Sequence, residues 1–482
     1  MIVDAGGAIC ASASRGYDLI VPAPNRVEVD PEAVWRGFTT TAAVLVARGR
    51  RLGLSLSAMA VSSSVDESVF IDANGQPIGR VIMAPDTRSS AAFSDWLGRV
   101  GVERCWAVTG LPAYPPYAIA RLLWLREHHP RLFMRVRRAL DWSAFIASRL
   151  GLPATTDPSI AARTMAWDVS AGAWSSELLG LAEMSQSLFP SVVPAGSAIG
   201  VTADDAARKS GLPRGLSFVV GGMDQWLAAI GSGVVDPGQA AVGTGTWEAL
   251  SAPLAAFPAF GEPLRRSGIS VGPFVPGDRY AALATQSGGL VVRWFGEVFA
   301  PGRPIGSLLR SAPDRPTGLL VQPHLEGSLS PWMDPDSRMA IAGLALTTGR
   351  NELLRGVLEG ITFELRENLS RIEASGVPLR ELRASGGGAR SRRWLQLKAD
   401  VLGRPVATVG NTATAAYGAA LLAGAGVGVF GPVAATARQF VRVERVYEPR
   451  PSFSRAYDEI FERYRQLYPA LRSLTPPPPP AG

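Results

Sequence analysis

Hydrophobic positions follow two alternating spacings along the chain. Short runs such as "LSFVV" and "GQAAV" have the length of buried strands, whereas "RNELLRGVLEGITFELRENLSRIEASG" repeats its apolar residues at helical spacing. Leu354, Leu358, Ile361 and Leu365 share one face of that helix, and Gly376 is expected to cap it. Because the two patterns alternate throughout, the sequence predicts an α/β protein built from layers.

Three further segments give specific expectations. The opening "MIVDAGGAICA" predicts a hairpin that turns at Asp4–Gly7, and "SAMAVSSSVDESVFIDANGQPIGRVIMAP" predicts strands around a turn at Asn74-Gly75. The segment "YAIARLLWLREHHPRLFMRVRRALDWSAFIASRLG" predicts only helices, broken at Pro130 and ended by Gly151.

The length of 482 residues predicts two or three domains. The charge-poor link "SGVVDPGQ" is the expected junction, which divides the chain into residues 1–236, 237–470 and a proline-rich tail 471–482. The run "LTPPPPPAG" in the tail is more typical of an unstructured end than of a ligand for SH3-type domains.

Composition narrows the partners and the compartment. The net charge is +7, but the arginines are scattered and no dense basic run suggests a nucleic-acid surface. The only cysteines, Cys10 and Cys105, form neither a zinc motif nor a disulfide framework, which favours a reducing cytoplasm. The longest uncharged stretch, 411–437, is rich in glycine and alanine and predicts a buried helix and loop, not a membrane span.

Three glycine turns are candidates for phosphate contacts, at 221–224, 243–246 and 386–389. Glycine lets backbone N–H groups approach a phosphate closely, and a following helix N-terminus favours the anion. None of them matches a Walker P-loop, because neither Lys209 nor Lys398 is placed after the glycines.

Two polar groups have competing interpretations. Asp224 lies at the end of the first turn, where its carboxylate could accept a proton from a substrate hydroxyl or could cap the following helix, and spacing alone does not decide. Asp86 and Arg88 in "APDTR" could bond polyol hydroxyls, but on their own they are more typical of a surface turn with an ion pair.

The order of motifs resembles the FGGY family of carbohydrate kinases over nearly the whole chain. The similar segments are, in order, "NRVEVDPEAVW", "GRVIMAPDTR", "TDPSIAARTMAWDVSAGAWS", "VVGGMDQWLAAIGSGVVDPGQAAVGTGTWE", "WMDPDSRMAIAGLALTTGRNELLRGVLEGITFELREN" and "ASGGGARSRRWLQLKADVLGRPV". The resemblance implies two ribonuclease-H-like domains of the actin–hexokinase type with a cleft between them. It also implies ATP-dependent phosphorylation of a sugar or polyol, such as a ketopentose, with Mg²⁺.

The resemblance also implies roles for individual residues. Asp224 becomes the expected general base, and the magnesium site is expected near it. The residues expected to contact the acceptor are Asp66, Glu67, Asp86, Arg88 and Gln225. The residues expected to contact ATP are Gly243, Thr244, Thr246, Gly289, Gly387, Gly388 and Ser391. The expected partners are ATP and a small sugar or polyol, with no nucleic acid and no membrane, and a homodimer is the candidate assembly.

The sequence departs from the family pattern at four places. The first strand with its Asp-x-Gly-Thr-Thr phosphate turn is absent, because Met1 aligns just after it. Ala84 stands where the family has tryptophan, "SSVDE" replaces the usual sugar-reading stretch, and Arg121 replaces the usual lysine. Acidic residues in the sugar-reading stretch favour a neutral, hydroxyl-rich acceptor over a sugar acid.

The missing first motif leaves two explanations open. A start codon assigned too late is favoured, because the remaining motifs are consistent with one another. The alternative is a catalytically impaired, pseudokinase-like member that binds sugar or nucleotide. A different ATPase of the same superfamily is disfavoured by "GGMDQ" and "GGGARSRRWLQ".

Overall fold

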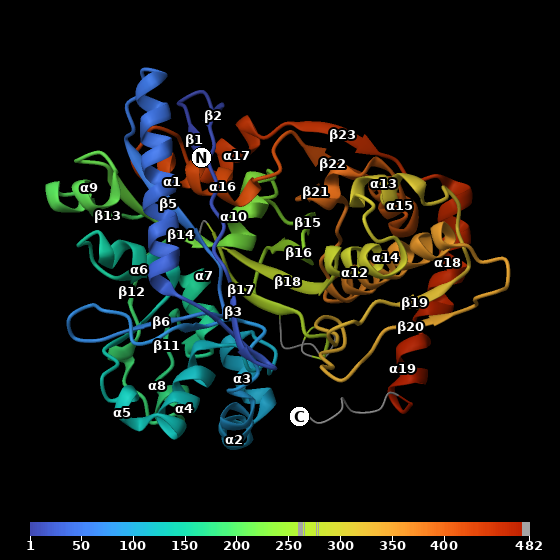
Figure 1. Ribbon diagram of the computed structural model, residues 1–482, viewed down its shortest axis with the longest axis horizontal. Helices are drawn as coiled ribbons and strands as arrows, with labels where there is room; N and C mark the ends of the chain where they lie inside the picture. The colour runs from blue at the N-terminus through green and yellow to red at the C-terminus, as the bar shows by residue number, and fades with distance from the viewer. Residues whose placement is uncertain (259–263, 265, 276, 278, 475–482) are drawn as a thin grey trace. The chain divides into compact units, whose positions relative to one another are not determined.

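The computed structural model describes residues 1–258, 264, 266–275, 277 and 279–474, and it divides into two compact units (Figure 1). Unit 1 comprises 1–231, 272–280 and 415–440, and unit 2 comprises 232–271, 281–414 and the chain from 441 onward. The chain therefore passes between the units more than once. The predicted domain boundaries stay predictions, and the proline-rich run from 475 lies outside the described residues.

Unit 1 contains many short strands. They are β1 (Ile2–Val3), β2 (Ile9–Ala11), β3 (Ile20–Ala23), β4 (Arg26–Val29), β5 (Ala58–Ser63), β6 (Val69–Ile71), β7 (Val81–Ile82), β8 (Arg138–Leu140), β9 (Thr155–Thr156), β10 (Trp167–Asp168), β11 (Ala173–Trp174), β12 (Ser191–Val192), β13 (Ala198–Val201) and β14 (Ser217–Met223). The helices are α1 (Pro31–Arg51), α2 (Ser90–Val100), α3 (Val102–Thr109), α4 (Ala118–His128), α5 (Pro130–Phe133), α6 (Trp142–Arg149), α7 (Pro158–Ala161), η1 (Ala162–Thr164), α8 (Ser176–Leu181), η2 (Gln186–Leu188), α9 (Asp204–Ser210), α10 (Asp224–Gly231), α16 (Thr414–Gly426) and α17 (Val433–Phe440).

The central sheet of unit 1 has the order β13-β14-β5, in which β14 runs parallel to β5. This sheet packs against α6 and α7. The predicted hairpin at the start of the chain is confirmed, because β1 pairs antiparallel with β2. It is held to the rest of the unit by the Tyr417 hydroxyl, which donates to the Gly7 carbonyl at 2.7 Å.

Unit 2 is built on one large mixed sheet and a separate pair of strands, β19 and β20. The strands of unit 2 are β15 (Gln239–Thr244), β16 (Trp247–Leu254), β17 (Ser270–Phe274), β18 (Arg279–Ser287), β19 (Leu320–Gln322), β20 (Ala340–Ala342), β21 (Glu381–Ser385), β22 (Val406–Val409) and β23 (Val443–Tyr447). Strands β17 and β18 each begin in one unit and end in the other. Its helices are α12 (Gly289–Phe299), α13 (Ile305–Ser311), α14 (Arg350–Ala374), η3 (Gly388–Arg390), α15 (Arg392–Leu402), α18 (Pro451–Tyr464) and α19 (Leu467–Arg472).

The large sheet has the order β17-β18-β16-β15-β21-β22-β23, with β15, β21 and β22 parallel to one another. The core beside it gathers apolar residues of α12, α14, α15 and α18. The predicted long helix is confirmed as α14, which ends at Ala374; Ser375 is its C-cap, and Gly376 follows with φ of +89°. Its middle is buried on all sides: a Cβ on Gly360 would lie 2.2 Å from the Val321 carbonyl oxygen, so the helix needs glycine to reach β19.

The prediction that the segment from Tyr117 to Gly151 contains only helices is wrong in part. Between α5 and α6 the chain forms β8, which pairs antiparallel with β6 (Val69↔Leu140, Ile71↔Arg138). The strand is only three residues long, and its partner lies far away in the sequence. The spacing of apolar residues within one segment contains no information on such a distant pairing. The helical pattern on either side of β8 therefore led to the prediction of helix there.

The glycines before Asp224 also differ from the prediction of a turn. Gly221 and Gly222 lie inside β14, and α10 starts directly after the strand at Asp224. A Cβ on Gly221 would lie 1.9 Å from the Val61 carbonyl oxygen, where the pairing with β5 is irregular. The glycines therefore serve close strand packing as well as the start of the helix.

The uncharged stretch 411–437 forms α16, a loop and the beginning of α17. The predicted helix and loop are confirmed, but the loop is largely exposed, not buried. Among the described residues, no helix is both long and apolar enough to cross a membrane.

Candidate active site

Asp224 stands at the end of β14, where the parallel strand β5 also ends. Gly222 and Met223 pair with Ser62 and Ser63, so the loop that follows β5 lies at the same edge of the sheet as the start of α10. That loop carries Asp66 and Glu67. Because parallel strands bring their carboxyl ends together, residues far apart in the sequence meet here.

The backbone before Asp224 is held by a buried serine. The Met223 N–H donates to Ser159 Oγ at 3.0 Å, and Ser159 in turn donates to Asp157 at 3.0 Å. Asp157 also accepts from the Ser159 and Ile160 N–H groups at the start of α7. The segment "TDPSIAART" therefore stabilises the end of β14, the strand that precedes Asp224, through the bond from Met223 to Ser159.

The half-buried Asp224 carboxylate has a raised pKa of about 6. Loss of hydration is the main cause, and the negative charge of Asp66 adds to it. The bond from the Gln225 N–H, at 2.7 Å, and the charge of Arg163 act in the opposite direction. A carboxylate with this pKa is ionised at neutral pH and is a stronger base than an ordinary aspartate.

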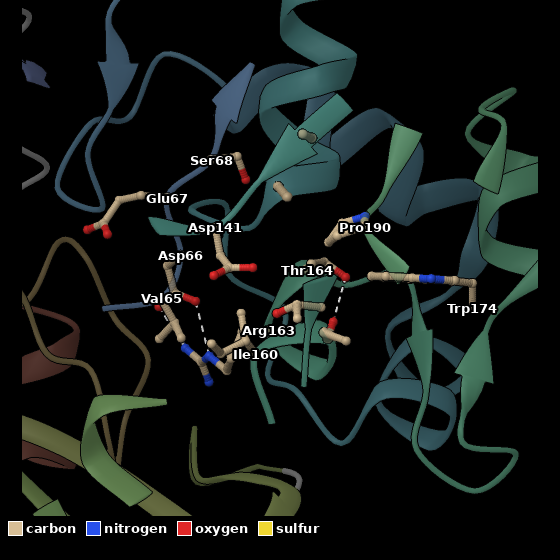
Figure 2. A pocket seen from close by; sticks show the side chains of 14 residues that line it. Val65, Asp66, Glu67, Ser68, Asp141, Ile160, Arg163, Thr164, Trp174 and Pro190 are labelled. Carbon is tan, nitrogen blue, oxygen red and sulfur yellow. Dashed lines mark hydrogen bonds and ion pairs between the residues drawn. The ribbon is translucent and has the colours of Figure 1, made fainter. Parts of the chain in front are cut away.

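Arg163 is a residue at this site that the sequence analysis did not single out. Its Nε and Nη2 donate to the two carboxylate oxygens of Asp66 at 3.0 and 2.7 Å, and Figure 2 shows the two side chains directed toward each other. It lies in η1, inside the segment "TDPSIAART". A lone arginine in a helix pattern gives no signal of this contact, because the partner comes from another part of the chain.

Glu67 has a different environment from Asp66. Its Oε2 accepts from Ser64 Oγ at 2.7 Å and from the Trp142 indole at 3.2 Å, and in Figure 2 it points away from Arg163. Burial raises the pKa of Glu67 to about 7, although these bonds and the charge of Arg121 oppose the shift. At neutral pH this carboxyl group can therefore either donate or accept a hydrogen bond.

A small cavity of about 20 Å³ lies next to these residues, lined by Asp66, Arg163, Asp141 and Thr156 among others (Figure 2). Asp141 caps α6 by accepting from the Ser143 and Ala144 N–H groups. The cavity has room for about one water molecule and is too small for a sugar. Its walls are mixed, because apolar side chains such as Ile160 and Trp174 line it beside the polar ones.

Asp86 and Arg88 bond mainly to each other and to neighbouring strands. Arg88 donates to Asp86 through Nε at 2.9 Å and Nη2 at 2.6 Å, and it reaches Glu28 at 2.8 Å. The buried Asp86 also accepts from the Val27 N–H at 2.7 Å. This ion pair joins β4 to the turn after β7. The predicted role of both residues toward the acceptor stays a prediction.

Arg121 lies between this ion pair and the Asp66–Glu67 loop. It is buried and donates to the carbonyls of Pro116 and Met83, and burial lowers its pKa to about 10. The negative charges of Glu67, Asp66 and Asp86 counteract that shift. Its positive charge therefore offsets part of the negative charge of Glu67, Asp66 and Asp86. Gln225 is half-buried in the first turn of α10, next to Asp224.

In unit 2, the predicted ATP residues gather at the ends of β15 and β21. Gly243 pairs with Ser385, and Thr244 Oγ1 donates to the Ser385 carbonyl at 2.6 Å. Gly386 follows with φ of +87°, in contact with the Thr244 backbone. The structure thus places the second and third glycine turns side by side.

Two helices begin at this edge of the sheet. The Gly289 and Leu290 N–H groups of α12 donate to the carbonyls of Gly245 and Thr246, each at 2.9 Å. A Cβ on Gly289 would lie 2.6 Å from the Gly245 oxygen, so this approach requires glycine.

The other helix, α15, is capped by Ser391, whose Oγ accepts from the Trp394 N–H. Gly388 lies against Thr244 and Trp394, and Gly387 is exposed at the turn. Exposed backbone at the carboxyl ends of parallel strands, next to two helix N-termini, is suited to binding phosphate groups.

Comparisons with known proteins identify the family of the chain. The model of the N-terminal domain of the FGGY family of carbohydrate kinases matches residues 1–231, and the model of its C-terminal domain matches residues 176–427. The chain belongs to the FGGY family of carbohydrate kinases. It is therefore a phosphotransferase of the sugar-kinase class, for which ATP is the expected phosphoryl donor, and the predicted two-domain fold and family are confirmed.

Individual FGGY kinases are similar along nearly their whole length. The chain is 26% identical to a xylulose kinase of Bacillus subtilis over 480 residues, which covers 98% of this chain and 95% of that one. It is 30% identical to a glycerol kinase of Citrifermentans bemidjiense over 464 residues, which covers 92% and 91%.

Solved structures show the same fold. A xylulose kinase from Rhodospirillum rubrum has a TM-score of 0.85 at 25% identity, covering 96% of this chain and 94% of that one. A gluconate kinase from Lactobacillus acidophilus has a TM-score of 0.87 at 23% identity, covering 97% and 94%, and shows the fold alone.

Proposed function

We propose that this FGGY kinase phosphorylates a hydroxyl group of a neutral sugar or polyol, with Asp224 as the general base. The observation that carries the proposal is the position of Asp224, at the strand end where Asp66 also arrives, with a pKa raised by burial to about 6. At neutral pH this carboxylate is ionised and can accept the proton of an attacking hydroxyl. Phosphoryl transfer asks little more of a protein than such positioning and charge stabilisation.

A neutral acceptor is favoured by the charges around the site. Asp66, Glu67 and Asp224 are acidic, and Arg163 is engaged by both oxygens of Asp66. Carboxylates accept hydrogen bonds from hydroxyl groups, whereas they repel a carboxylate on the substrate. Because the names of similar proteins include xylulose kinase and glycerol kinase, ketoses and short polyols are the first acceptors to examine.

The proposed ATP contacts are those of the two glycine turns in unit 2. The exposed turn at 243–246 would receive the phosphates, with Gly289 beside it, and Gly387, Gly388 and Ser391 would border the nucleoside. The first N–H groups of α12 are already bonded to Gly245 and Thr246, so they hold the turn in place. Support comes from the close packing of Gly386 and Gly388 against Thr244, which makes the two turns one surface.

Magnesium fits this arrangement as a companion of ATP. Among the described residues no group of three metal-binding side chains occurs, but Mg²⁺ needs only one or two carboxylates when phosphates and water supply the other ligands. Asp224 is the carboxylate that would contact it. Bound there, the ion would supply charge neutralisation on the phosphates.

The test is a coupled ATP assay with a panel of pentuloses, glycerol, tetritols, hexitols and gluconate. We expect turnover with a neutral acceptor and a reduction of about 10²–10⁴-fold in kcat for Asp224→Asn, since a base aligned with the hydroxyl contributes that much. Nucleotide affinity, measured by calorimetry, should stay within twofold. The wild-type kcat/KM should fall as pH decreases below about 6, because Asp224 becomes protonated.

A matched control is Asp95→Asn, which changes an exposed carboxylate on α2 and should leave kcat unaltered. Surviving turnover in Asp224→Asn would remove Asp224 from the mechanism. A clear preference for gluconate would overturn the neutral acceptor. A wild-type protein that binds ATP yet phosphorylates no acceptor would instead support the non-catalytic alternative.

A further inference from the structure

The end of β14 is held by a helix as well as by a strand. Strand β13 pairs with β14 as far as Val219, whereas β5 accompanies β14 to Met223. At this end the Met223 N–H donates to Ser159 Oγ of α7 at 3.0 Å. Both residues are buried, so loss of the hydroxyl would take this acceptor from an N–H group that water does not reach, which costs free energy.

The Ser159 hydroxyl is oriented by Asp157. Ser159 Oγ donates to Asp157 Oδ1 at 3.0 Å, which leaves the oxygen lone pairs free to accept from Met223. The buried Asp157 is itself fixed, because its carboxylate caps α7 through the N–H groups of Ser159 and Ile160. Pro158, the first residue of α7, restricts the backbone between Asp157 and Ser159. The acceptor for the Met223 N–H therefore has one defined orientation.

The backbone of β14 approaches these two side chains closely. A Cβ on Gly222 would lie 3.3 Å from Ser159 Oγ and 3.6 Å from Asp157 Oδ2. Glycine at this position leaves room for the contact between β14 and α7. Because a single peptide bond joins Met223 to Asp224, any displacement of the strand end is passed directly to the proposed base.

We propose that Ser159 is a positioning residue for phosphoryl transfer, which holds the end of β14 so that the Asp224 carboxylate meets the acceptor hydroxyl. The inference rests on the proposed function of Asp224 as the general base. Ser159 touches neither substrate and acts only through the Met223 N–H. A misplacement of about 1 Å at a reacting group lowers the rate by about 10²-fold, so one buried hydrogen bond next to the base has a measurable effect on kcat.

The experiment compares Ser159→Ala with wild type and with a matched control, Thr202→Val. The buried Thr202 hydroxyl also has two bonds: it donates to the Pro213 carbonyl and accepts from the Leu216 N–H at 3.1 Å. Leu216 directly precedes β14, at the end of the strand away from Asp224. Each substitution therefore removes one buried hydroxyl that holds β14, but only Ser159 lies at the end with the proposed base.

Steady-state kinetics on the best neutral acceptor give the first readout. We expect kcat of Ser159→Ala to fall by about 10- to 100-fold, as for a displaced reacting group. The KM values for acceptor and ATP should stay within about twofold of wild type, because the lost contact acts only on the reacting geometry. Thr202→Val should keep the wild-type kcat, although urea unfolding should show a similar loss of stability. An equal loss of kcat in both variants would show a merely structural role and overturn the proposal.

Hydrogen exchange measures the hold of Ser159 on the strand without reference to activity. Exchange of the Met223 amide, followed by mass spectrometry of short peptides, should be faster by roughly fivefold or more in Ser159→Ala, the equivalent of one net hydrogen bond. Thr202→Val should instead speed the exchange of the Leu216 amide and leave Met223 close to wild type. Unchanged exchange of Met223 in Ser159→Ala would contradict the role of Ser159 whatever the activity.

Asp224→Asn, assayed beside these variants, keeps this inference separate from the proposed function. If Asp224→Asn is inactive while Ser159→Ala keeps the wild-type kcat, Asp224 remains the base and Ser159 is not a positioning residue. If Asp224→Asn retains turnover, or if the wild type phosphorylates no acceptor, the proposed function fails. The exchange of the Met223 amide then decides alone whether Ser159 holds the end of β14.

Discussion

At the scale of single residues, the position of Asp224 depends on glycines that have no side chain to contribute. Gly221 lies so close to β5 that any Cβ would overlap the Val61 carbonyl. A Cβ on Gly222 would meet Val275 at 2.8 Å and Ser159 at 3.3 Å. The strand that presents the proposed base is therefore packed at backbone distance on β5 at Gly221, and against the side chains of Val275 and Ser159 at Gly222.

Gly221→Ala tests this close packing. The added methyl group would force β14 away from β5, and we expect destabilisation at or above the upper end of the roughly 1–3 kcal/mol typical of overpacking, because the obstacle is backbone. Urea unfolding measures it, and kcat should fall as well, since Asp224 follows three residues later.

The matched control is Gly180→Ala in α8, where a Cβ meets nothing within 4 Å. Alanine is the better helix former, so the midpoint of unfolding should be unchanged or slightly higher. Equal stability of Gly221→Ala and wild type would show that β14 and β5 can separate without cost, against the geometry described.

At the scale of elements, the proposed nucleotide surface is made by the beginnings of α12 and α15. Helix α15 begins after the glycine turn at 386–389, and α12 begins at Gly289 against the turn at 243–246. These two turns meet through the bond from Thr244 to the Ser385 carbonyl. The first N–H groups of α12 are tied to the turn at 245–246, which fixes that helix to the hairpin between β15 and β16. The elements, more than any one side chain, would create the proposed phosphate-binding geometry.

Ser391→Ala tests the start of α15. Loss of the N-cap should cost about 1 kcal/mol of stability and raise the KM for ATP several-fold, with kcat nearly unchanged, because the proposed contact is with the nucleoside. Chemical unfolding and steady-state kinetics measure the two effects.

Ser175→Ala is the matched control for this experiment. Ser175 caps α8 in unit 1 by accepting from the Leu178 N–H at 3.2 Å, so its loss should have a similar cost in stability and no effect on the KM for ATP. If the KM for ATP rises equally in both variants, the rise results from the loss of a helix cap and not from the position of Ser391 near the nucleotide.

At the scale of the whole molecule, several carboxyl groups of unit 1 are buried with raised pKa values. Desolvation raises the pKa of Asp157 and Glu67 to about 7 and that of Asp224 to about 6. The folded chain therefore binds more protons than the unfolded chain between the ordinary carboxyl range and pH 7. Linkage then requires that stability falls as pH rises through this window and levels off above it.

Asp157→Asn tests this expectation. One proton changes the unfolding free energy by at most about 1.4 kcal/mol per pH unit. Between about pH 5 and pH 7 the unfolding free energy of Asp157→Asn should therefore decline less steeply with pH than that of the wild type, by up to this amount per pH unit. The absolute stability changes too, because the Ser159 and Ile160 N–H groups donate to different oxygens of Asp157 and Asn keeps only one of these oxygens. The slope is independent of that loss. Asp95→Asn, on the surface, should keep the wild-type slope; an unchanged slope in Asp157→Asn would contradict the raised pKa.

Local patterns predicted those elements whose signal lies within one segment. The long helix α14, the hairpin of β1 and β2 and the position of Asp224 between a strand and a helix all follow from spacing and glycine content. Two predictions failed where a distant partner decides: β8 exists because β6 lies beside it, and Gly221 and Gly222 lie in a strand because β5 does.

The sequence by itself determined the family, the α/β class and the order of the motifs, because these depend on residue type and spacing along the chain. Only the tertiary structure decided that Arg163 clamps Asp66, that Asp86 and Arg88 bond chiefly to each other, and that the two glycine turns of unit 2 form one surface. Ion pairs and burial depend on which segments meet when parallel strands bring their ends to one edge. The charge balance around the proposed base is therefore a property of the fold, which spacing along the chain does not contain.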